Sequence, residues 1–335
     1  MVINLIIRPF AEADYPAIAE VFNAAWPDEA YAEGGLREDD TTHAPEVRWG
    51  RFVAEVEGKI VAEADYTQFE GMYHPNKFAA WVTVRPEYRG QGIGGALWRE
   101  LLEALKPHDP ISILSSTRED QLHAIAWLRK LGFAEKMRYW ESRLDVRGFD
   151  FAPWAGKIEA VEAPGFELKS LKELEADPEH RRKAYEMFLA AREDVPRPEP
   201  ATAISYEDWQ KWVFESSYFL PEANFFAVDR ATGLYAAQSN LWKSDGDYLS
   251  VGLTGTRREY RRKGLALALK LKALQFAKAY GARELRTGNE AGNRPMLAIN
   301  EAMGFVKQPI WADYIKTFKE EAAEAATPAA AKEEA

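Results

Sequence analysis

The sequence predicts an α/β protein in which an α+β mixed-sheet domain occurs twice in tandem. Three observations predict this: a length of 335 residues, an internal repeat in a fixed register, and the same order of strand and helix patterns in each copy. A chain of this length exceeds one typical domain of roughly 150 residues, so two domains are expected. We place the domains at residues 1–147 and 165–318, a linker at 148–164, and a disordered Ala/Glu tail at 319–335.

The repeat is carried by two separate motifs. The tripeptide EYR at 87–89 recurs at 259–261, and the tripeptide LGF at 131–133 recurs as MGF at 303–305. The spacing between the two motifs is identical in the two copies, so a single offset relates them. Because both motifs keep one register, chance is a poor explanation, and the chain is predicted to be a tandem duplication.

Each copy shows the same elements in the same order. Period-two runs with turn residues indicate strands, and apolar residues at helical spacing indicate helices. In the first copy we expect a strand at 3–10, a helix at 11–26, a hairpin at 51–69, a strand at 78–84, a helix at 93–105, a strand at 111–116, a helix at 122–130 and a strand at 137–146. In the second copy we expect a strand at 166–171, a helix at 173–192, a hairpin at 225–242, a strand at 248–256, a helix at 265–281, a strand at 282–289, a helix at 294–302 and a strand at 309–318.

Composition excludes several classes of function. A net charge of -10 argues against a general nucleic-acid or membrane-surface binder, because phosphate binding needs a basic face. The chain has no cysteine, and its five histidines are scattered without a metal-binding spacing, so no metal site is expected. No secretory signal or long apolar run is visible, and we therefore expect a cytoplasmic protein.

Glycines are concentrated where a strand meets a helix, in RGQGIGG at 89–95. Main-chain amides at a helix N-terminus lack helical partners, and small residues let a phosphate approach them. Gly90, Gly92 and Gly95 also match the dinucleotide-binding fingerprint, which leaves a nicotinamide-dependent oxidoreductase as one alternative. That fingerprint normally opens its domain, however, and the second copy, RRKGLAL at 261–267, keeps only its middle glycine. Both copies retain Arg-x-x-Gly-x-Gly/Ala.

This pattern, followed by a Gly-Phe turn after the next helix, resembles the GCN5-related N-acetyltransferase (GNAT) family. The resemblance covers residues 3–146 and 165–318, in an organisation similar to that of mycothiol synthase. It implies two acyl-CoA N-acyltransferase folds and an acetyl-CoA-dependent enzyme. The acetyl group would pass directly to a primary amine in a ternary complex.

The resemblance also implies which residues bind acetyl-CoA. The strand before each loop would pair with the pantetheine arm, and the loop would hold the diphosphate, with help from Arg257 and Arg258 in the second copy. The implied cofactor-binding residues are Val82, Thr83, Val84, Arg89, Gly90, Gln91, Gly92, Ile93, Gly94 and Gly95 in the first copy, and Thr254, Gly255, Thr256, Arg261, Arg262, Lys263, Gly264, Leu265, Ala266 and Leu267 in the second.

The catalytic groups depart from the family pattern. Family members commonly place a tyrosine acid four residues before the glycine of the Gly-Phe turn, where this chain has Leu128 and Asn300. Our catalytic candidates are therefore Asn300, Asn293 and Glu70, although helix capping explains Asn293 and an exposed loop explains Glu70 equally well. The asparagines favour the second copy as the catalytic one. A non-catalytic acyl-CoA-binding or regulatory protein remains the alternative.

The acceptor is predicted only as a class. Segments 26–49 and 191–209 are rich in Pro, Asp and Glu, and we interpret them as mobile loops on the substrate side. Acidic loops and tryptophans favour a small cationic amine through charge steering and cation–π contact. A polyamine, an aminoglycoside, an amino acid, a sugar amine and a protein N-terminus all stay open. The oligomeric state is expected to be monomer or homodimer.

Overall fold

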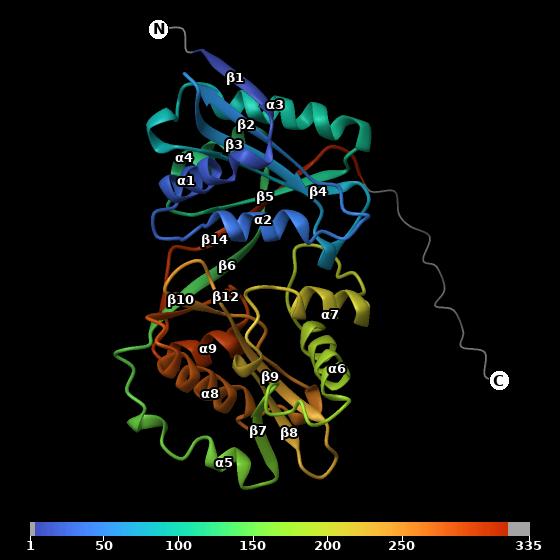
Figure 1. The fold of residues 1–335 in the computed structure, drawn as a ribbon, viewed down its shortest axis with the longest axis vertical. Helices are drawn as coiled ribbons and strands as arrows, with labels where there is room; N and C mark the ends of the chain where they lie inside the picture. The colour runs from blue at the N-terminus through green and yellow to red at the C-terminus, as the bar shows by residue number, and fades with distance from the viewer. Residues whose placement is uncertain (1–3, 321–335) are drawn as a thin grey trace, which may run out of the picture.

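A single mixed sheet runs through both halves of the chain in the computed structural model, which describes residues 4–320 (Figure 1). Its strands are β1 (Leu5–Pro9), β2 (Gly50–Val56), β3 (Lys59–Thr67), β4 (Lys77–Val84), β5 (Ser112–Arg118), β6 (Ala134–Asp145), β7 (Phe166–Ser170), β8 (Asn224–Asp229), β9 (Tyr235–Trp242), β10 (Tyr248–Val251), β11 (Gly255–Thr256), β12 (Glu284–Glu290), β13 (Val306–Lys307) and β14 (Trp311–Thr317). They lie in the order β1-β2-β3-β4-β5-β14-β6-β12-β10-β9-β8-β7, while β11 pairs with β9 and β13 with β6.

Helices cover both faces of this sheet in each half. They are α1 (Tyr15–Ala25), α2 (Glu33–Thr41), α3 (Ile93–Leu105), α4 (Leu122–Lys130), α5 (Glu159–Glu162), α6 (His180–Arg192), α7 (Tyr206–Phe214), α8 (Leu265–Tyr280) and α9 (Arg294–Ala302). In the first half α1 and α3 both contact β3, and in the second half α6 and α8 both contact β9. Each pair belongs to two different hydrophobic clusters, so its two helices lie on opposite faces of the sheet.

The predicted mixed α/β fold and the tandem duplication are confirmed. Helices α3 and α8 begin at Ile93 and Leu265, and helices α4 and α9 begin at Leu122 and Arg294. The two pairs of helix starts are related by the same offset as the two sequence motifs. Each helix follows a strand in both halves, so the repeat in the structure has the register of the sequence motifs.

The last strand of each half pairs with the other half, which the sequence did not predict. Strand β14 lies between β5 and β6 and is antiparallel to both. Strand β6 in turn pairs with β12 of the second half, from Glu284↔Asp145 to Glu290↔Tyr139. The two halves therefore exchange equivalent strands, and the sheet is continuous between them (Figure 1).

Several predicted boundaries were wrong. The helix expected from residue 173 begins at His180, because Pro178 lacks an N–H and disfavours helical geometry in the residue before it. The first segment interpreted as a substrate loop contains α2, and the second contains the start of α7. Ser205 caps α7 by accepting a hydrogen bond from the Asp208 amide at 3.0 Å. The predicted linker contains α5, and all but the first two residues of the predicted tail lie outside the described residues.

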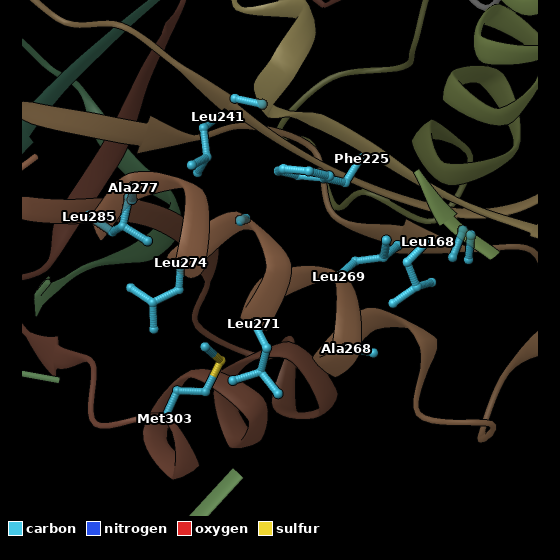
Figure 2. Packing of buried hydrophobic residues seen from close by; sticks show 14 of the residues in the cluster. Leu168, Phe225, Leu241, Ala268, Leu269, Leu271, Leu274, Ala277, Leu285 and Met303 are labelled. Carbon is cyan, nitrogen blue, oxygen red and sulfur yellow. The ribbon is translucent and has the colours of Figure 1, made fainter. Parts of the chain in front are cut away.

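The largest hydrophobic core lies beneath α8 in the second half (Figure 2). Leucines on α8 pack onto strands β8, β9 and β12, where Phe225, Leu241 and Leu285 point toward the helix. Ala268 and Ala277 are buried on the same helix, and their small side chains let it approach the sheet closely. This packing fixes the first turn of α8, on which the candidate site depends.

Candidate active site

A gap opens in the sheet next to each glycine loop. In the first half β4 and β5 are paired only from Lys77↔Ser112 to Ala79↔Leu114, and the strands then separate. In the second half β10 and β12 are paired only as far as Val251↔Thr287. Beyond that point the chain pairs with β9 instead, through β11. Each half therefore places its loop beside separated strands.

The loops, which we call the first cradle (residues 89–95) and the second cradle (residues 261–267), have the same backbone. Gly90 and Gly92 adopt φ of 76° and 86°, and their counterparts Arg262 and Gly264 adopt 63° and 80°. The first helical hydrogen bond is donated by Ala96 to Gly92 O in one half and by the equivalent Ala268 in the other. The three amides before each of these donors have no helical partner, which suits a diphosphate.

The first cradle is also open above its backbone. Across residues 4–320, a Cβ added to Gly90, Gly92 or Gly95 would meet no side chain or distant main-chain atom within 4 Å. At Gly94 the nearest atoms belong to Val84, at 3.7 Å. Gly94 thus lies against the preceding strand, and the free space at Gly90, Gly92 and Gly95 leaves room for a diphosphate beside the unpaired amides.

The arginines that open the two cradles have matching roles but different electrostatics. Arg89 Nε donates to Val84 O at 3.1 Å, and Arg261 Nε donates to Thr256 O at 3.3 Å. Burial lowers the pKa of Arg89, which forms no ion pair within the described chain. In the second cradle Arg261 is instead paired with Asp194, whose carboxylate also accepts from Arg258 at 2.9 Å. The second cradle is therefore partly neutralised before any ligand arrives.

Asp194 should weaken CoA binding at the second cradle. Hydrogen bonds from Arg258 and then Arg261 hold the pKa of Asp194 below its usual value, so it stays ionised near neutral pH. We expect Asp194→Asn to tighten CoA binding by about two- to fivefold, the range for exposed ion pairs. Calorimetry in a Gly92→Val background isolates the second cradle, and Glu193→Gln serves as the neighbouring control. An unchanged or weaker affinity in Asp194→Asn would contradict this account.

In the first half the gap is closed by a side-chain bridge. Trp81 on β4 donates its indole N–H to Ser116 Oγ on β5 at 3.0 Å, across the separated strands. Phe69 packs edge-on against the same indole with ring centroids 5.9 Å apart. Tyr139 lies beside Ser116 and Asp313, and burial raises the pKa of Asp313 to about 6. The bridge therefore links the two separated strands of the first half.

The equivalent positions in the second half carry no bridge. In the register of the repeat, Leu253 stands at the position equivalent to Trp81, and Gly288 stands at the position equivalent to Ser116. A Cβ on Gly288 would meet nothing within 4 Å in the described part of the chain, so the space there is free. Sequence reasoning missed both residues, although applying the repeat offset to positions 81 and 116 reveals the two substitutions. The open gap distinguishes the second half from the first.

Two asparagines lie on the α8 and α9 side of that gap. Asn300 is 1% exposed, and its Nδ2 donates to Asn289 Oδ1 at 2.6 Å. The Asn300 Oδ1 is buried and has no hydrogen-bond partner among residues 4–320. The first half has Thr117 and Leu128 at these positions, which cannot form such an amide pair. Buried polar atoms are rarely left unpartnered, so the orphaned oxygen suits a ligand N–H such as those of pantetheine.

The other two catalytic candidates lie elsewhere. Asn293 is the N-cap of α9, and its Oδ1 accepts from the Met296 amide at 3.4 Å. Glu70 is exposed on the loop after β3 and accepts from the Ala44 amide at 2.7 Å. It lines a cavity of about 630 Å³ between the two halves. The structure therefore places Glu70 near the second half rather than at the gap of its own half.

The cavity reaches Leu253, which stands at the gap of the second half. Leu253 lines both the large cavity and a smaller one of about 150 Å³ beneath α6 and α7. Phe188 and Trp212 also line both, so the two spaces share an aromatic wall. In the second half the strands therefore separate beside a cradle, and Leu253 at the same place lines the cavity.

Two further features are absent from the described residues: a metal-binding cluster and a helix that could span a membrane. Between residues 4 and 320 there is no group of three or more His, Asp or Glu side chains placed to hold a metal ion. Over the same range we find no helix whose length and apolarity would carry it across a bilayer.

Comparison with known proteins identifies the family. The two cradles beside separated strands place the protein in the class of acyltransferases. Residues 11–133 and 183–305 each match the Acetyltransferase (GNAT) family, and the chain belongs to this family, with one family domain in each half. No curated protein matches the sequence.

Solved structures show the same tandem architecture. A tandem GNAT protein from the clavulanic acid biosynthesis pathway, without AcCoA, is 22% identical with a TM-score of 0.75, covering 95% of this chain and 100% of that one. A GCN5-related N-acetyltransferase from Sphaerobacter thermophilus is 18% identical with a TM-score of 0.69, covering 93% and 95%. At these identities the likeness establishes the fold of both halves together.

Proposed function

We propose that the protein is an acetyl-CoA-dependent N-acetyltransferase whose second half transfers the acetyl group to a primary amine of a small molecule. The observation that carries this proposal is the end of strand pairing beside the second cradle, where Leu253 and Gly288 stand in place of the Trp81–Ser116 bridge and Leu253 also lines the cavity of about 630 Å³. A direct transfer in a ternary complex needs a passage between the strands, because the donor and the acceptor approach from opposite faces of the sheet. The first half, closed by Trp81, lacks it.

Each part of the second half then has a defined role. The amides of the second cradle bind the diphosphate, and main-chain groups of residues 254–256 pair with the pantetheine arm. Bound acetyl-CoA supplies the thioester, whose C–S bond breaks as the amine nitrogen forms its bond to the acetyl carbon and loses a proton. Asn300, paired with Asn289, offers an amide near the sulfur that can accept from pantetheine and donate to the leaving thiolate.

A group in the cavity wall removes the proton from the amine in this scheme. Glu70 is a carboxylate in the cavity wall with one oxygen engaged by the Ala44 amide, which leaves the other for a proton. Asn293 has no part in this scheme, because its side chain caps α9. We therefore keep Glu70 and Asn300 as the candidate catalytic residues.

The features of the first half favour a second role for it, in which it binds acyl-CoA without catalysing transfer. Its cradle is open and its Arg89 carries no ion pair within residues 4–320, yet its gap is bridged. The alternative reading of a non-catalytic acyl-CoA-binding protein therefore applies best to this half. One bound acyl-CoA there would stabilise the fold without turning over.

Replacing Asn300 by leucine, the residue at the equivalent first-half position, tests the proposal. We expect kcat for acetyl-CoA-dependent thiol release with an amine acceptor to fall by about 10- to 100-fold, the range for one lost transition-state donor. The acetyl-CoA affinity should fall by no more than about tenfold, the range for one lost hydrogen bond to pantetheine. Asn293→Ser is the matched control, because serine preserves the cap of α9. Full activity in Asn300→Leu, or thiol release that needs no amine in the wild type, would refute the proposed mechanism.

A further inference from the structure

The cavity between the halves has walls from both halves that are hydrogen-bonded to each other. Its second-half wall includes the segment 195–204, which the sequence suggested was a mobile loop. In the structure this segment is pinned to the first half: the Thr202 amide donates to Gly71 O at 3.1 Å, and the Tyr73 amide donates to Thr202 Oγ1 at 2.6 Å. Both halves therefore contribute fixed walls, and whatever occupies the cavity contacts both.

Two guanidinium groups in this wall lack a carboxylate partner. Arg192 donates to Thr202 O at 2.9 Å and to Gly71 O at 2.7 Å. Arg197 donates to Val195 O at 3.0 Å and to Arg192 O at 2.6 Å. Within residues 4–320 neither arginine forms an ion pair. Backbone carbonyls orient these two cations without neutralising them, which leaves their positive charge available to an anionic group.

Burial of the two arginines agrees with this geometry. Desolvation lowers the pKa of Arg192, and desolvation together with the nearby charge of Arg192 lowers the pKa of Arg197. Two like charges held side by side and partly out of water repel each other. A bound anion relieves that repulsion and forms charge-assisted hydrogen bonds, which are about twice as strong as neutral ones.

Within residues 4–320, the acidic side chains of the cavity wall form no ion pair with Arg192 or Arg197. Asp208 accepts a hydrogen bond from the Ser205 hydroxyl at 2.6 Å at the start of α7, and Glu70 accepts from the Ala44 amide. Glu46 completes the acidic lining. Phe188, Trp212 and Leu253 form the apolar part, and Leu253 lies at the open gap. The cavity therefore offers cationic, acidic and aromatic groups together, with the aromatic part next to the gap.

We propose that this cavity binds the acceptor and that the acceptor is an amino-acid-like amine: an apolar or aromatic body carrying both a primary amine and a carboxylate. The inference rests on the proposed function, because it assigns the substrate class of the same site. The carboxylate binds to Arg197 and Arg192, the body packs on Phe188 and Trp212, and the amine points to Leu253. In transfer, the N–C bond forms, the C–S bond breaks with the electron pair going to sulfur, and the amine proton passes to Glu70 or water.

The matched probes L-phenylalanine and phenethylamine test this inference, because they differ only by the carboxylate. Binding is followed by tryptophan fluorescence without acetyl-CoA, and transfer is followed by thiol release with acetyl-CoA. Wild-type protein should bind phenylalanine at least about tenfold more tightly than phenethylamine, as one charge-assisted pair implies. Arg197→Gln should remove this preference, raise KM for phenylalanine and leave kcat nearly unchanged. Arg181→Gln, which removes a cation of α6 that lies over the Phe214 ring, is the control.

The outcomes separate the inference from the proposed function. Equal binding of both probes, failure of both to bind, or an undiminished preference in Arg197→Gln overturns the carboxylate site. If phenethylamine is acetylated as well as phenylalanine, the enzyme stands and the inference falls. If phenylalanine binds through Arg197 but no thiol is released, the site stands and the proposed acetyl transfer falls. Arg192 is left unchanged throughout, because it also pins the two halves together.

Discussion

Replacing Leu253 by tryptophan together with Gly288 by serine is expected to abolish acetyl transfer. The two changes copy into the second half the indole-to-hydroxyl bridge that Trp81 and Ser116 form in the first. The gap would then be closed between the cradle and the cavity, so that amine and thioester cannot meet. Since displacement of reacting atoms by about 1 Å can lower a rate roughly 10²-fold, we expect at least that loss in kcat/KM.

The measurement needs to distinguish a closed gap from a misfolded domain. Thermal unfolding and CoA binding by calorimetry should stay close to wild type in the double variant, because the cradles are untouched. Leu253→Met at the same position preserves volume and should retain most activity. If the double variant keeps wild-type turnover, the second-half gap is not the passage for acetyl transfer, and the assignment of the catalytic half is wrong.

The repeat and the cradles were predictable because they depend on local sequence. Two tripeptides in one register defined the duplication, and a glycine-rich turn before an apolar helix defined each cradle. The positive φ values at Gly92 and Gly264 show the physical reason for those glycines. The same local reasoning fails at Arg262, which adopts φ of 63° without being glycine, so the first glycine of the loop is not essential to its shape.

The site itself was less predictable, because it depends on contacts between distant segments. The sequence around Leu253 and Gly288 does not indicate a function. The two residues become informative only when they are compared with Trp81 and Ser116, which stand at the equivalent positions of the first half. Glu70 was selected as a candidate but was assigned to its own half, since the sequence does not show that the loop after β3 faces the other half. The Ser205-x-x-Asp208 cap was visible in the sequence and was overlooked because the prolines before it suggested a loop.

Strand exchange between the halves was beyond sequence reasoning for a different reason. Strands β6 and β14 are equivalent in the repeat, so the alternation of their side chains suits pairing within a half as well as between halves. Loop lengths and tertiary packing decide between those pairings. The buried residues of β14 show the result: Ala312 and Tyr314, each 2% exposed, belong to the core of the first half.

Neither half is therefore expected to fold when the chain is expressed as two separate fragments, residues 1–155 and 156–335. The first fragment lacks Tyr314 from its core, and the second lacks Leu144 and Val146, which are 4% and 0% exposed. Loss of one buried aromatic side chain alone removes about 3–5 kcal/mol, out of a typical net stability of about 5–15 kcal/mol. Each fragment would also expose a strand edge that the missing strand normally covers.

Mixing the fragments should restore the exchange and with it the fold. We expect each fragment alone to lack a cooperative thermal transition as a monomer, and an equimolar mixture to recover one together with CoA binding. The cut lies between exposed residues, Ala155 and Gly156, so a chain cleaved there after folding is the matched control and should melt as the mixture does. If both fragments melt cooperatively as monomers near the temperature of the intact chain, the exchanged strands are dispensable. The reciprocal pairing of β6 and β14 would then not be what joins the two halves into one folding unit, and the shared cavity would have to be explained by surface contacts alone.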